Sequence, residues 1–135
     1  TQVKIGGTSA LEKIGDENWL QTEFLQTVQT RGAKVIEKLG RSSAASAANA
    51  VLGTVRSLYE PTPKGEWFST AVCSDQNPYG IGEGLIFGFP CASSGDGSYH
   101  IVPDLKIDPF IREKIALTEK ELREEMEFCK KEGLL

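Results

Sequence analysis

The chain has 135 residues, of which 39% are hydrophobic and 25% are charged. This composition is typical of one folded globular domain and argues against a disordered chain. The net charge is −4 and the sequence has no basic cluster, so a row of nucleic-acid phosphates would not be neutralised. No apolar run approaches the ~20 residues needed to cross a bilayer. We therefore expect neither a nucleic acid nor a membrane among the partners.

The N-terminal third predicts a brief strand followed by helices. Residues 3–7 read as a strand and a Gly-Gly turn, and Ser9 opens a short helix because Glu12 follows at capping-box spacing. Asp16 then precedes a long pattern in which apolar residues recur at steps of three, four and seven. Gly40 is a natural end for this long helix.

The next segments predict one more helix and then a meander. Residues 41–59 form a helix that begins with mostly Ala and Ser and ends before Pro61. Runs rich in β-formers at 67–75, 85–91 and 99–102 are separated by turn residues, which predicts three antiparallel strands. Pro90 lies near the end of its predicted strand, a position tolerated on a sheet edge.

The last quarter of the chain returns to helix. Residues 110–115 predict a short turn of helix, and Thr118 with Glu121 forms a capping box that starts the final helix, which Gly133 ends. The fold class is therefore α+β: long helices packed on an antiparallel β-meander, with a C-terminal helix, in a single domain over residues 1–135.

Few residues predict chemistry by their pattern. Cys73, Cys91 and Cys129 are widely scattered, which predicts reduced packing thiols in a reducing compartment and no metal site. His100 follows no pattern of a catalytic base, so a structural or exposed histidine is favoured. Gly80–Gly84 has the wrong spacing for a phosphate loop, and a hairpin connection is favoured.

The segment from Gly40 to Ser46 is the most informative. It places Arg41 and the hydroxyls of Ser42, Ser43 and Ser46 at a helix start, where free N–H groups can bind an anion or a polar substrate. The alternative is a capped helix with a close-packed Ala/Ser face. Composition alone favours this structural alternative.

Six runs in a consistent order carry a family resemblance. They are VQTRGAKVI at 28–36, GRSSAAS at 40–46, PTPKGEWFST at 61–70, NPYGI at 77–81, FPC at 89–91 and TEKEL at 118–122. Together these runs resemble the C-terminal domain of malate dehydrogenases of the cytosolic type, within the lactate/malate dehydrogenase superfamily. The similarity covers residues 4–130, and residues 40–43 and 90–91 resemble its plastid NADP-dependent members.

The resemblance implies an activity for the parent enzyme. It would interconvert malate and oxaloacetate by hydride transfer with NAD or NADP, a reaction of malate metabolism and the tricarboxylic acid cycle. It would act as a homodimer in the cytoplasm or, alternatively, in a plastid. The dinucleotide-binding domain lies outside these 135 residues, and Thr1-Gln2 resembles the end of the catalytic-histidine motif. We therefore expect no catalytic residue here and no turnover by the isolated chain.

The resemblance also assigns roles to individual residues. Ser42, Ser43 and Ser46 match positions that line the substrate pocket, and Ser43 also faces the nicotinamide cofactor. The helix over residues 17–39 matches the dimer contact, which makes Trp19, Gln21 and Phe24 candidate interface residues. Cys129 aligns near a redox-regulatory cysteine of plastid members. The alternative to an enzyme part is a non-catalytic, dehydrogenase-derived module for interaction or dimerisation.

Overall fold

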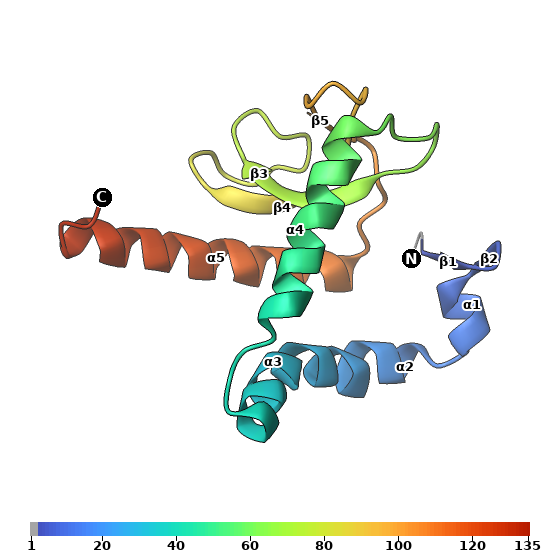
Figure 1. The fold of residues 1–135 in the computed structure, drawn as a ribbon, viewed down its shortest axis with the longest axis horizontal. Coiled ribbons are helices and arrows are strands. Elements are labelled where there is room, and N and C mark those ends of the chain that lie inside the picture. The colour runs from blue at the N-terminus through green and yellow to red at the C-terminus, as the bar shows by residue number, and fades with distance from the viewer. Residues whose placement is uncertain (1–2) are drawn as a thin grey trace. The chain divides into compact units, whose positions relative to one another are not determined.

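The computed structural model describes residues 3–135, so Thr1-Gln2 lies outside the described residues. The described residues divide into two compact units, one up to Asn49 and one from Ala50 onward (Figure 1). Its elements confirm an α+β fold with two small antiparallel sheets and a C-terminal helix.

The first unit begins with the predicted strand and turn. Strands β1 (Lys4–Ile5) and β2 (Thr8–Ser9) form an antiparallel hairpin across two glycines with positive φ. Helix α1 (Ala10–Ile14) follows, as expected, and ends at a left-handed Gly15. Ser9 occupies its N-cap position, but the side chain makes no capping hydrogen bond. The capping-box part of the prediction is therefore wrong.

The long predicted helix is present but is not continuous α-helix. Helix α2 (Glu17–Trp19) starts where predicted, with the Asp16 side chain accepting a hydrogen bond from Trp19 N–H at 2.8 Å. A π-helical turn η1 (Leu20–Phe24) then precedes α3 (Leu25–Leu39). Within this turn the Thr22 hydroxyl donates to the Asn18 carbonyl at 2.7 Å. Gly40, with a φ of 68°, ends α3 as predicted.

Helix α4 (Ala44–Tyr59) begins three residues later than the sequence predicts. Residues 41–43 precede its first turn, where Ser46 N–H donates to the Ser43 carbonyl at 3.0 Å. Its end at Tyr59 agrees with the prediction, because the prolines that follow cannot continue the helix.

The predicted meander is confirmed in strand order and direction. Strands β3 (Phe68–Cys73), β4 (Ile86–Ala92) and β5 (His100–Ile101) are antiparallel, with β4 in the centre. Pro90 lies within this central strand, opposite Ser69, so its predicted place at a sheet edge is wrong. It is tolerated because its missing N–H points toward the short strand β5, where the ladder is nearly over.

Helix α5 (Pro109–Lys131) is one helix rather than the predicted two. The Asp108 side chain accepts from Ile111 N–H at 2.9 Å, and Pro109 stands at the first helical position. Thr118 is consequently an interior residue, and its predicted role as a helix start is wrong. Gly133, with a φ of 68°, lies just past the helix end.

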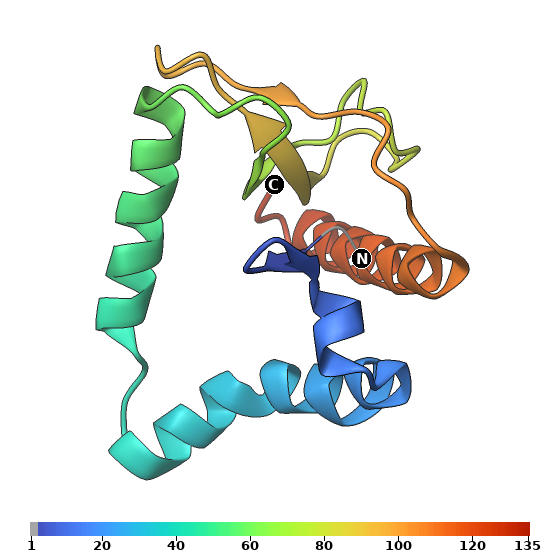
Figure 2. The same cartoon turned by 90° about the vertical axis from the view of Figure 1, so that its right-hand side faces the viewer.

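The core of the second unit lies between the sheet and α5. Both views show α5 running along one face of the meander (Figures 1 and 2). The buried residues are Val72, Ile81, Leu85, Phe89 and Cys91. From α5, Ile115, Leu122 and Met126 pack against them and form the apolar stripe of this helix.

Candidate substrate site

The three candidate serines lie at the start of α4 in the first unit. Ser42 and Ser43 occupy the connection after Gly40, and Ser46 lies in the first helical turn. All three are exposed. The Ser42 carbonyl accepts from Ala44 N–H at 3.0 Å, which folds the connection tightly onto the helix start. The structure thus places these three residues at the N-terminal end of α4, the positive end of its dipole.

The small side chains of this segment leave its surface open. Every residue from 41 to 53 is exposed, so the close-packed Ala/Ser face that composition favoured is not formed within the described residues. An uncovered helix start with hydroxyl groups can hydrogen-bond an anionic group. Both the polar-ligand and the packing interpretations of residues 40–46 stay open.

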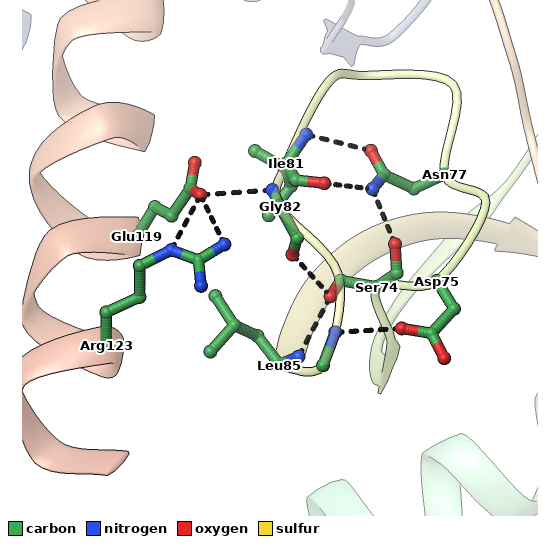
Figure 3. A network of polar contacts seen from close by, with 9 residues as sticks. Ser74, Asp75, Asn77, Ile81, Gly82, Leu85, Glu119 and Arg123 are labelled. Carbon is green, nitrogen blue, oxygen red and sulfur yellow. Dashed lines mark hydrogen bonds and ion pairs between the residues drawn. The ribbon is translucent and has the colours of Figure 1, made fainter. Parts of the chain in front are cut away.

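The Gly-rich segment after β3 is a hairpin connection, as predicted. The side chains of Ser74, Asp75 and Asn77 bond to its backbone, Asp75 by accepting from Gly84 N–H at 2.8 Å (Figure 3). The Ser74 hydroxyl donates to the Gly82 carbonyl at 2.8 Å and accepts from Leu85 N–H at 3.0 Å. The Asn77 amide donates at 2.6 Å to the Ser74 and Ile81 carbonyls. These bonds satisfy most of the connection's inward-facing polar groups, so the segment is built to hold itself together.

One N–H group of the connection points outward and already has an anionic partner. Gly82 N–H donates to Glu119 Oε1 of α5 at 3.0 Å, and the same oxygen accepts from Arg123 Nη2 at 3.1 Å (Figure 3). A side-chain carboxylate of the same chain therefore already accepts from this N–H group. Sequence reasoning missed this contact, because 37 residues separate Gly82 from Glu119 and neither carries a motif.

His100 lies in the third strand, as predicted, and is exposed. It lines a shallow hollow of about 340 Å³ together with residues 62–67, among them Lys64 and Trp67. The hollow is in the second unit, and none of the three candidate serines lines it.

The three cysteines are all free thiols in different surroundings. Cys91 is fully buried in the core, where burial raises the pKa of its thiol. Cys129 is half-buried on α5, while Cys73 is exposed at the end of β3. The packing prediction is confirmed for Cys91 and is wrong for Cys73, because the strand alternation turns that side chain to the solvent face.

Asp96 is the other residue whose pKa is shifted. The Ser98 hydroxyl and N–H both donate to Asp96 in an exposed turn, and these bonds lower the pKa of that carboxyl.

Within residues 3–135 there is no cluster of three or more metal-ligating side chains. The helices of this same region include none that is long and apolar enough to cross a membrane.

Comparisons with known proteins identify the family of this chain. A family model described as the lactate/malate dehydrogenase, alpha/beta C-terminal domain matches residues 1–132. Malate dehydrogenase of Protochlamydia amoebophila is 56% identical over 114 residues, which cover 84% of this chain and 34% of that protein. The chloroplastic NADP malate dehydrogenase of Pisum sativum is 48% identical over 119 residues, covering 88% and 27%.

A solved lactate dehydrogenase structure has a similar fold. A Trichomonas vaginalis lactate dehydrogenase, solved in complex with NADH and oxamate, superposes with a TM-score of 0.84 at 31% identity. The match covers 96% of this chain and 39% of that one. The chain thus spans about a third of the length of the relatives it matches. It belongs to the family of lactate/malate dehydrogenase C-terminal domains.

Proposed function

We propose that this chain is the substrate-binding and dimerisation domain of a malate dehydrogenase, which interconverts malate and oxaloacetate with a nicotinamide cofactor. The observation that carries the proposal is the 56% identity, over 114 residues, to a protein named malate dehydrogenase. The structural relative with a lactate dehydrogenase name is less similar, at 31% identity. Malate is therefore the favoured substrate, and all of residues 1–135 act as one domain in this proposal.

Within this domain, Ser42, Ser43 and Ser46 form the substrate side of the pocket. Their exposed hydroxyls stand at the positive end of α4, which suits a dicarboxylate. Ser43 also borders the nicotinamide ring in this proposal. The small size of a serine leaves room for both molecules, so a bulky residue at this position would exclude one of them.

The cofactor is NAD or NADP. The Trichomonas relative was solved with NADH, while the pea relative is named for NADP, so the two names support a nicotinamide cofactor without a choice between them. We propose a homodimer formed through the region of α2 to α3, where the apolar residues Phe24 and Val28 are exposed. A cytoplasmic location is favoured, with a plastid as the alternative that the chloroplastic relative supports.

The test is an assay of the full-length polypeptide that contains this chain. Oxaloacetate-dependent oxidation of NADH or NADPH, followed at the absorbance of the reduced cofactor, is the expected activity. No turnover with either cofactor would overturn the proposal. The isolated 135-residue chain serves as a control and should give no oxidation.

A pair of variants tests the site itself. Ser43→Leu should raise the KM for oxaloacetate at least about tenfold, because the larger side chain occupies the pocket; a tenfold change corresponds to about 1.4 kcal/mol. Ser57→Leu, in the last turn of the same helix and far from Ser43, should leave KM unchanged. Equal effects of the two variants would remove Ser43 from the site while leaving the proposed activity standing.

A further inference from the structure

We draw no further inference here: the strongest candidate, the apolar groove of about 340 Å³ between the first residues of β4 and the N-terminal half of α5, carries none, because nothing in the structure shows which segment or partner covers it.

Discussion

Pro90 lacks one ladder hydrogen bond, and the hydroxyl of Tyr79 replaces it. The Pro90 carbonyl accepts from Val102 N–H at 2.8 Å. In a regular antiparallel pair the N–H of residue 90 would donate back to the Val102 carbonyl, but proline has no N–H. The Tyr79 hydroxyl donates to that carbonyl instead. A proline is therefore compatible with the central strand because a side chain from the neighbouring connection supplies the missing donor.

This substitution of donors can be tested by a double-mutant cycle. Tyr79→Phe keeps the ring that stacks on Phe89 but removes the donor, so it should lower the free energy of unfolding by about 1 kcal/mol. Pro90→Ala restores a backbone N–H, so the same Tyr79→Phe change should be less costly in that background. Urea denaturation of the four proteins measures both costs. Equal costs in the two backgrounds would show that the hydroxyl does not replace the backbone donor.

The buried thiol of Cys91 predicts an alkaline loss of stability. Burial raises its pKa in the folded state above the ordinary value of 9.0, so the unfolded chain loses this proton at a lower pH than the folded one. The stabilising contribution is complete below about pH 9 and is lost as pH rises through the folded-state pKa. The free energy of unfolding should therefore fall above about pH 9.

Two alanine variants separate this group from the others that titrate in the same range. Cys91→Ala should flatten the decline measured by urea denaturation between neutral and alkaline pH, after allowance for its lower starting stability. Cys73→Ala removes an exposed thiol and should keep the full decline. If both variants decline as steeply as the original chain, the Cys91 thiol is not the source.

At the scale of the element, the start of α5 shows how two sequence signals compete. The segment contains an Asp-Pro pair at residues 108–109 and a capping box at Thr118, and either can begin a helix. The structure uses the first, so the capping-box residues lie within the helix. We predict that Asp108→Ala lowers the free energy of unfolding by about 1 kcal/mol, as the loss of an N-cap does. Thr118→Ala, its matched control, should change it by less than about 0.5 kcal/mol. A larger effect at Thr118 in thermal denaturation would contradict this assignment.

The position of α5 on the sheet depends on one carboxylate as well as on its apolar stripe. Glu119 accepts from Gly82 N–H and from Arg123, and its side chain is 23% exposed. We predict that Glu119→Ala lowers the free energy of unfolding by about 1–2 kcal/mol, because both donors lose their acceptor. Glu121→Ala removes an exposed carboxylate from the same helix and should have an effect within about 0.5 kcal/mol. Urea denaturation of both variants measures these changes. Similar decreases in the free energy of unfolding would show that the contacts of Glu119 do not hold α5 on the sheet.

The elements that could be predicted from the sequence are those with local sequence signals. Glycines such as Gly40 and the apolar periodicity of α3 are local signals, and the structure confirms the helices and strands that they predict. The π-helical turn at Leu20–Phe24 has no signature in the apolar pattern, so the sequence gives no warning of it. The contact between Gly82 and Glu119 depends on where the chain returns to itself, which no short pattern reports.

The candidate site follows the same rule. The hydroxyls of Ser42, Ser43 and Ser46 are neighbours because one helix start holds them, so their grouping is readable from sequence spacing. Composition nevertheless favoured a packed helix face, because Ala and Ser suit close approach as well as they suit an open pocket. The segment is exposed in this chain, which is compatible with both interpretations.

At the scale of the whole molecule, much apolar surface stays uncovered. On α4, Leu52 is 66% exposed and Val51 is 61% exposed, and on α3 the figure for Leu39 is 65%. Large apolar side chains that are this exposed are candidates for an interaction face. The proposed function accounts for these exposed side chains, because the other domain of a dehydrogenase, or a second subunit, would cover the two helices.

The chain by itself should therefore associate with other copies. Sedimentation equilibrium should give an average mass that rises above 14.7 kDa as concentration increases. Leu52→Gln replaces an exposed apolar side chain by a polar one of good helix propensity, so it should weaken the association by removing buried apolar area. Ala50→Gln, at an exposed position that helical geometry places on the opposite side of α4, should leave the association unchanged. A stable monomer at all concentrations would mean that these helices do not need a partner, and it would weaken the case that α3 and α4 belong to an interface of a larger enzyme.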